Sequence, residues 1–183
     1  MARDQGKGKG KGARTKPGSG RSLKVGASVA AVVVVAAIVG WFAYRAAADL
    51  PGEKLPDLGN EHIQTSSDPR VAYNSDPPTS GPHLPYIAPW GIHTRPIPLE
   101  LQVHNLEDGG VVVQYNCACP EVVDKLRGIV TKYDKYVILA PYPGMKSRIA
   151  LTAWTRLDRF EELDEARVVR FIEKYRGIDH HKR

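Results

Sequence analysis

The sequence has few cysteines and methionines, and none of the motifs on which the common enzyme sites are built. It contains only two cysteines, at positions 117 and 119, and one methionine besides Met1. The serine-hydrolase GxSxG, the zinc-peptidase HExxH, the phosphate-binding loop and the dinucleotide-binding GxGxxG are all missing. A chain of 183 residues has room for one ordinary domain with attachments. These absences argue against an enzyme of a familiar class.

Acidic residues are almost missing from the first 24 positions. The formal net charge of the whole chain is +6, but residues 1–24 alone carry eight Lys or Arg side chains and a single acid, Asp4. With Arg45 also counted, residues 46–183 are left with a net charge of −2. A slightly acidic folded part gives no electrostatic support for binding nucleic acid. The Gly- and Lys-rich segment 1–24 is instead typical of a disordered tail.

Charged residues are absent from Val25 to Tyr44, a stretch of twenty residues. About 20 apolar residues in a helix span the hydrocarbon core of a membrane, so 25–45 is predicted to be a single transmembrane helix. The positive-inside rule places the basic tail in the cytoplasm. We therefore expect a single-pass protein of a bacterial plasma membrane, with a cytoplasmic N-terminus and with residues 46–183 outside the cell membrane.

A cleaved signal peptide is the alternative interpretation of the same segment. The three residues Ala46-Ala47-Ala48 offer a signal peptidase the small side chains that it needs. Signal peptides usually have an apolar run of about 7–15 residues, and the run in this sequence is longer. We favour a retained anchor, and both interpretations export the rest of the chain.

Composition divides the exported part into three segments. Residues 46–70 contain scattered prolines and acids and are predicted to form a stalk. Residues 71–177 are predicted to form the extracytoplasmic domain, and 178–183 a polar tail. Within the domain, the proline-rich and aromatic segment 71–98 is expected to be irregular and to pack on the rest, because proline disfavours regular structure.

The periodicity of apolar residues after Pro98 predicts an α+β domain. Alternating apolar and polar residues predict a strand over 99–105, which we expect to form a hairpin with a strand over 111–115. The remaining expected elements are a helix, two strands and a second helix, over 120–133, 136–140, 149–155 and 164–177. We therefore expect a small mixed β-sheet with two main helices, including one βαβ unit.

The two cysteines lie between a predicted strand and a predicted helix. In the motif Cys117-Ala118-Cys119-Pro120, the positive end of the helix would favour the thiolate form. Three interpretations stay open: a reactive disulfide, a thiolate pair for Cu(I) or Zn(II), and a structural disulfide without chemistry.

Histidines and a methionine add to a set of metal-binding residue types. His83 lies in a rigid Gly-Pro context, His93 and His104 follow along the chain, and Met145 is placed in a loop. Cysteine, histidine and methionine together are typical of copper sites. His180 and His181, in the polar tail, are predicted to be solvated.

Several longer motifs resemble one bacterial family. They are YNSDPPTSGPH (73–83), Trp90-Gly91, VHNLEDGGVVVQY (103–115), VILAPYP (137–143) and IALTAWTR (149–156). Their combination is similar to the membrane-anchored family catalogued as domain of unknown function 3105, over residues 60–177. The resemblance implies a transmembrane helix before the domain and brings no established activity.

The resemblance also implies which residues matter. The family pattern has histidine at the positions of His83 and His104, and methionine at the position of Met145. It commonly has a further histidine where this chain has Asp108, so Asp108 would act as an oxygen ligand or the cysteines would substitute. The Cys-x-Cys pair is more variable in the family, so no general thiol mechanism is implied.

The leading hypothesis from the sequence is a membrane-anchored, extracytoplasmic copper-binding domain that handles metal rather than catalysing a reaction. The predicted ligands are His83, His104 and Met145, with Cys117, Cys119 and His93 in addition, and the predicted partner is a metal donor or acceptor protein. Two alternatives stay open. One is a thiol-disulfide protein that uses the cysteine pair, and the other is a partner-binding module that uses the segment 73–98.

Overall fold

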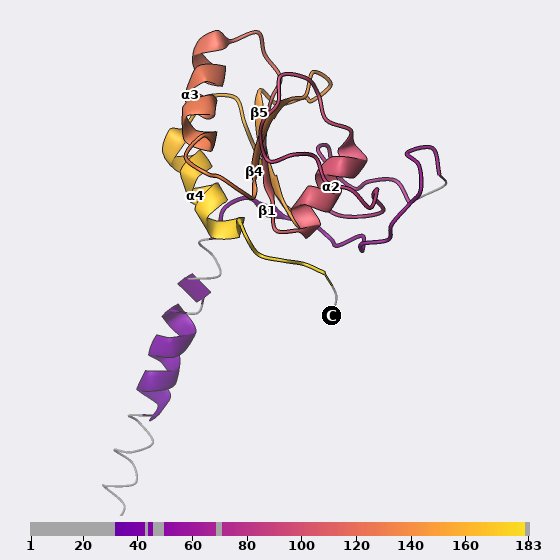
Figure 1. Ribbon diagram of the computed structural model, residues 1–183. Helices are drawn as coiled ribbons and strands as arrows, with labels where there is room; N and C mark the ends of the chain where they lie inside the picture. The colour runs from indigo at the N-terminus through magenta and orange to yellow at the C-terminus, as the bar shows by residue number, and fades with distance from the viewer. Residues whose placement is uncertain (1–31, 43, 46–49, 69–70, 182–183) are drawn as a thin grey trace, which may run out of the picture. The chain divides into compact units, whose positions relative to one another are not determined.

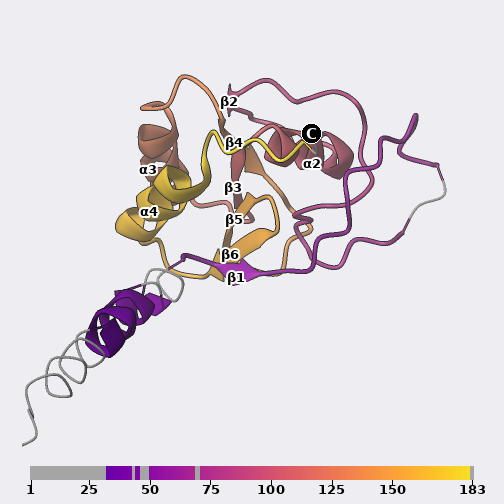
Figure 2. The ribbon, with the colours of Figure 1, turned by 90° about the horizontal axis from the view of Figure 1, so that it is seen from below.

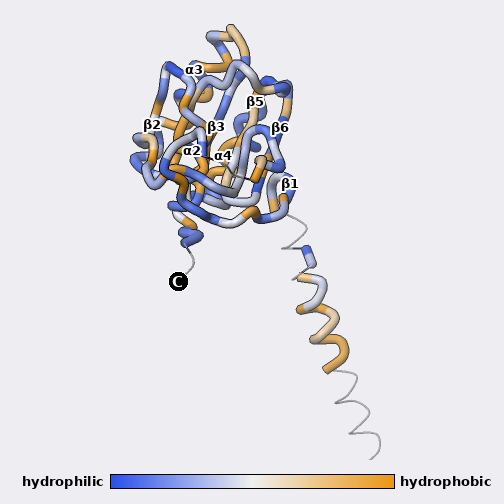
Figure 3. Tube along the Cα trace, turned by 90° about the vertical axis from the view of Figure 1, so that its right-hand side faces the viewer, coloured by the Kyte–Doolittle hydropathy of each residue, from blue (hydrophilic) through white to orange (hydrophobic). Residues whose placement is uncertain are grey.

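The computed structural model describes residues 32–42, 44–45, 50–68 and 71–181, which belong to two units. The first unit, Met1–Asp49, contributes a helix over 32–42 and 44–45, and Figure 3 shows this helix in mostly hydrophobic colours. Among the described residues, no helix has the length and apolar character needed to cross a membrane. The basic tail, and residues 25–31 and 43 of the predicted transmembrane helix, lie outside the described residues.

The second unit, Leu50–Arg183, is built on a six-stranded mixed sheet with the strand order β1-β6-β5-β3-β4-β2. Figure 2 shows the strands in this order. Strands β2 and β3 run parallel to β4, and the other neighbours are antiparallel. The strands are β1 Glu53–Lys54, β2 Gly91–Ile92, β3 Val111–Tyr115, β4 Val137–Pro141, β5 Ile149–Ala153 and β6 Arg156–Phe160.

Helices cover both faces of the sheet. α3 (Pro120–Val130) and α4 (Glu165–Tyr175) lie on one face, and α2 (Leu99–Glu107) lies on the other (Figure 1). Side chains of a strand alternate between the faces. Val111 and Val113 of β3 accordingly pack in the cluster with α3 and α4, whereas Val112 packs in the cluster with α2. The predicted α+β class and the β3–α3–β4 unit with parallel strands are confirmed.

Helix α4 begins where the sequence predicts. The side chain of Asp164 accepts a hydrogen bond from the backbone N–H of Arg167 and caps the helix. The guanidinium of Arg167 in turn donates two bonds, of 2.8 and 2.5 Å, to Asp158 on β6. Strand β6 is not among the elements predicted from the sequence, although Leu157, Asp158 and Phe160 of this strand are buried.

The predicted strand over 99–105 and its hairpin are wrong, because this segment is helix α2. The alternation of apolar and polar residues did not correspond to a strand here, because polar side chains of α2 are buried and form hydrogen bonds with the irregular segment before the helix. Gln102 donates to the carbonyl of Ile97 at 2.7 Å. The side-chain amide of Asn105 bonds to both the N–H and the carbonyl of Ala88, at 2.8 and 2.9 Å. Leu, Glu and Gln also have high helix propensity, which agrees with the observed structure.

The segment assigned to a stalk contributes to the compact unit from Leu50 onwards. β1 is an edge strand of the sheet and pairs with β6, and Ile63 is buried. Aromatic residues of the segment 73–98 also pack on the domain, with Tyr73 and Trp90 against the α2 cluster, whereas Tyr86 is exposed. A partner surface made of these rings is therefore reduced mainly to Tyr86 and its neighbour Ile87.

Candidate metal centre

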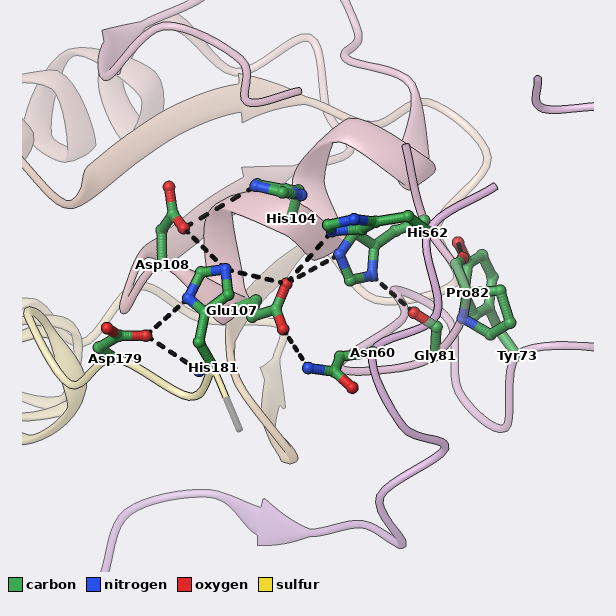
Figure 4. A network of polar contacts seen from close by, with 11 residues as sticks. Asn60, His62, Tyr73, Gly81, Pro82, His104, Glu107, Asp108, Asp179 and His181 are labelled. Atoms are coloured by element: carbon green, nitrogen blue, oxygen red, sulfur yellow. Dashed lines mark hydrogen bonds and ion pairs between the residues drawn. The ribbon is translucent and has the colours of Figure 1, made fainter. Parts of the chain in front are cut away.

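The centre of the site is one face of helix α2. Residues three and four positions apart lie on the same side of a helix. His104, Glu107 and Asp108, the residue that follows the helix, therefore project together toward the segments that cross over α2 (Figure 4). A strand would have placed His104 and Glu107 on opposite faces.

Two histidines from the chain between β1 and β2 complete the site. His62 and His83 form an isolated parallel β-bridge, with backbone hydrogen bonds of 2.9 Å from His83 N to the Glu61 carbonyl and 2.8 Å from Ile63 N to the His83 carbonyl. The imidazole rings of His62, His83 and His104 lie with their centroids 5.0–5.1 Å apart. The bridge therefore fixes the two rings against α2.

The carboxylate of Glu107 occupies the middle of this group. Its side chain is 1% exposed. Its Oε2 atom is 3.0 Å from Nε2 of His83 and 3.8 Å from Nε2 of His62, while Oε1 accepts a 2.5 Å bond from Asn60 (Figure 4). A buried carboxylate is costly unless it is paired. The Asn60 amide donates to Oε1, whereas the neighbours of Oε2 are imidazole nitrogens.

The four side chains fit the coordination of a single ion. Three imidazole nitrogens and one carboxylate oxygen all lie within 4.8 Å of one another. Ligand atoms about 2.0–2.2 Å from an ion are separated by about 3.3–3.6 Å in a tetrahedral arrangement. The side chain of His62 is 42% exposed and is the least enclosed of the four. The described chain therefore contains a buried group that could hold a metal ion.

Hydrogen bonding fixes which nitrogen of His83 is available. Its Nδ1 atom is 2.7 Å from the carbonyl oxygen of Gly81. A carbonyl can only accept, so Nδ1–H donates and the neutral ring carries its lone pair on Nε2. That lone pair faces the Glu107 oxygen at 3.0 Å. Two acceptors at this distance need a proton or a metal cation to hold them, and a carbonyl that orients a histidine in this way is common at metal sites.

Two further observations support His104 as a metal ligand. Its Nδ1 atom is buried and has no hydrogen-bond partner among the described residues. Burial, followed by the nearby His83 ring, lowers the pKa of His104, so the imidazole favours its neutral form. Neutral imidazole is the form that binds metals. An unpaired buried nitrogen is costly by itself, and a bound ion would satisfy it.

The structure brings together only two of the predicted ligands. His83 and His104 belong to the group, but Met145 packs in an apolar cluster with Ala150 and Leu157. Cys117 and Cys119 form a disulfide before α3, and the ring of His93 bonds to the Pro89 carbonyl at 2.7 Å. Met145, the two cysteines and His93 therefore do not belong to the histidine group.

Sequence reasoning missed His62 and Glu107. His62 lies in the segment that was assigned to a stalk. Glu107 lies just after the strand predicted over 99–105, where no helix was expected to align it with His104. One signal was present, because the spacing His-x-x-Glu-Asp over 104–108 places three ligand types on one side of a helix. His181, predicted to be solvated, is also part of this region, with Nε2 at 3.5 Å from Oε2 of Glu107.

Comparison with known proteins gives one match. The family model described as protein of unknown function (DUF3105) matches residues 64–182, which is more than half of the chain. No curated protein and no solved structure matches the chain significantly. His83, His104 and Glu107 lie inside the matched range, whereas His62 lies just before it.

Proposed function

The chain belongs to the family of unknown function DUF3105, and from its site we propose that it binds a transition-metal ion through His62, His83, His104 and Glu107. The proposed role is to hold and pass on the ion. Two side chains of the set, those of His83 and Glu107, are buried at 0% and 1% exposure and sit on fixed backbone. Such a site favours retention of an ion.

One observation carries the proposal. The Nε2 lone pair of His83 faces a carboxylate oxygen at 3.0 Å, and its orientation is set by the Gly81 carbonyl on the other side of the ring. A structural histidine would need to be protonated to make this contact. A metal ion explains the contact, and it also supplies a partner for the unpaired Nδ1 of His104.

The donor set favours a divalent ion. Three imidazoles and one carboxylate suit Zn(II), Ni(II) or Cu(II), and the general affinity order places Cu(II) above the other two. Copper therefore remains our proposal for the tightest ion. The amino-acid composition favoured Cu(I) because thiolates bind it well. In the structure both cysteines are paired in a disulfide, which weakens that argument.

We also propose that the site works on the outer surface of a membrane. The uncharged stretch Val25 to Tyr44 and the basic tail before it support an anchor with the N-terminus in the cytoplasm. The folded unit would then meet metal ions, and the proteins that donate or accept them, outside the cytoplasm.

Substitution of His62 tests the site with the least damage to the fold. In the full chain, purified in mild detergent, His62→Ala is expected to weaken Cu(II) binding by at least about 10-fold, because loss of an outer partner already costs about 10–100-fold and His62 is proposed as a direct ligand. The side chain of His62 is 42% exposed, so its removal leaves little empty space in the core. The measurement is a competition titration against a Cu(II) chelator of known affinity.

His93→Ala is the matched control, because it removes a histidine that bonds to Pro89 outside the group. This variant is expected to bind as the wild type does. Equal affinity in all three proteins, or no binding by the wild type, would contradict the proposed function.

The thiol-disulfide alternative has one observation in its favour, which is that Cys119 occupies the N-cap of α3. A helix N-terminus stabilises a thiolate there after reduction. The metal proposal makes a separating prediction. A double Cys117→Ser, Cys119→Ser variant is expected to keep the Cu(II) affinity and stoichiometry of the wild type. A loss of binding in the competition titration would show that the thiols are ligands.

A further inference from the structure

A second trio of ligand types lies beside the first group. We propose that His104, Asp108 and His181 hold a second metal ion, and that the two positions form one dinuclear centre. This inference rests on the proposed function, because it adds a position to the same site. The ligands expected for it are again divalent transition-metal ions, which suit imidazole and carboxylate together.

The geometry of the trio matches that of the first group. One ligand atom from each of the three residues lies within 4.8 Å of the others. Oδ1 of Asp108 is 3.8 Å from Nε2 of His104 and 3.7 Å from Nε2 of His181 (Figure 4). Asp108 thus points between two imidazole nitrogens that come from different parts of the chain.

The two positions share their central residues. Oε2 of Glu107 is within 3.0–3.8 Å of Nε2 on each of three histidines, His83, His181 and His62. A carboxylate so placed can bridge two ions, which in dinuclear sites lie about 3.5–4 Å apart. His104 is common to both groups, with Nε2 facing Asp108 and the buried Nδ1 without a described partner. A neutral imidazole has one free lone pair, so His104 would bind one of the two ions and not both.

The C-terminal segment holds His181 in place. Gly177 N donates to the Gly109 carbonyl at 2.7 Å, and His180 N donates to the Glu107 carbonyl at 2.9 Å. The ring of His180 also stacks on Trp154, with centroids 5.9 Å apart. These contacts hold the C-terminal tail against the end of α2. They therefore fix the position of His181 in the folded unit.

The outer ring nitrogen of His181 is oriented as well. Nδ1 lies 2.7 Å from Oδ1 of Asp179, which leaves Nε2 directed at Glu107 and Asp108 (Figure 4). A carboxylate behind a histidine is a frequent arrangement at metal sites, where it fixes the tautomer of the ring. Asp179 would therefore be a positioning residue rather than a ligand.

The two positions differ in exposure. Two inner ligands, His83 and Glu107, have side chains that are 0% and 1% exposed, and the third imidazole, His62, is 42% exposed. The side chains of Asp108 and His181 at the outer position are 31% and 43% exposed. An ion at the outer position can therefore exchange with solvent or with a partner more readily than an ion at the inner one. This gradient fits a site that takes up an ion at the surface and retains another in the interior.

Copper stoichiometry and electron paramagnetic resonance test the second position. The full chain in mild detergent is loaded with Cu(II) in the presence of excess glycine, which removes weakly bound ions. We expect about two ions per chain and a half-field signal from two coupled Cu(II) centres a few Å apart. The variants Asp108→Asn and His181→Ala are each expected to bind about one ion and to give the spectrum of isolated Cu(II).

The outcomes separate the two proposals. One ion per chain in the wild type, unchanged in His181→Ala and Asp108→Asn, would overturn the second position and leave the first intact. No ion retained by the wild type would overturn both. Two uncoupled ions would overturn the shared centre, and His93→Ala, which alters a histidine outside both groups, should behave as the wild type.

Discussion

Replacing Glu107 with glutamine is expected to lower the affinity of the chain for Cu(II) by about 100-fold or more. Loss of an outer partner of a metal ligand already costs about 10–100-fold, and Glu107 is proposed as a direct ligand. Its Oε2 atom faces nitrogen atoms of His62, His83 and His181 at 3.0–3.8 Å. The substitution removes the only negative charge among the four inner ligands, and the competition titration measures its effect.

The same substitution should leave the metal-free fold intact. Glutamine keeps the oxygen that accepts the bond from Asn60, and its amide N–H can donate to the Nε2 lone pair of His83. The melting temperature in the presence of chelator is therefore expected to stay at or above that of the wild type. Glu53→Gln, at an exposed carboxylate that pairs with Arg159, is the matched control. Wild-type affinity in Glu107→Gln would exclude Glu107 as a ligand.

Replacing Gly110 with alanine is expected to destabilise the folded unit by about 3 kcal/mol, because the added methyl group has no room. A Cβ atom at this position would collide with the backbone carbonyl of Asn105 and lie 2.7 Å from the ring of Trp90. Gly110 N also donates to the same carbonyl at 2.7 Å, so the backbone cannot move away without losing that bond. In a chain of this size the loss corresponds to about 6–12 °C in melting temperature.

Gly128→Ala provides a control with the opposite expected sign. Gly128 lies on the exposed side of α3, where an added Cβ meets nothing within 4 Å. Alanine is favoured over glycine in a helix, so this variant should gain about 0.5–1 kcal/mol. Both variants are compared by urea unfolding of the full chain with chelator present. Equal stability of the two variants would show that the turn after α2 tolerates the larger residue.

The main error of the sequence prediction also explains why the site was not found. Alternation over 99–105 indicated a strand that ends before Glu107, so the helical spacing that aligns His104 with Glu107 was not expected. The segment is a helix because the preceding loop satisfies its buried polar side chains, as Asn105 does with Ala88. No local pattern contains that loop contact. The assignment of His62 to a stalk had the same origin, since its bridge with His83 joins distant residues.

Residue types also gave an incomplete account of the ligands. Composition placed Met145, Cys117 and Cys119 with the histidines because all are soft or imidazole ligands. The fold instead buries Met145 against Ala150 and Leu157 and joins the cysteines to each other. The residue type determines which ions a side chain can bind. The residues around it in the fold determine whether it lies near other ligands.

The sequence by itself determined the features that depend on neighbouring residues. The apolar stripes of α3 and α4, the Asp164 cap and the strand β3 follow from periodicity and capping, which act over a few positions. The family followed from motifs distributed along the domain. The candidate metal centre needed the tertiary structure, because its proposed ligands come from the chain between β1 and β2, from the end of α2 and from the C-terminal tail. Long-range packing brings these parts together, and Glu107 lies where they meet.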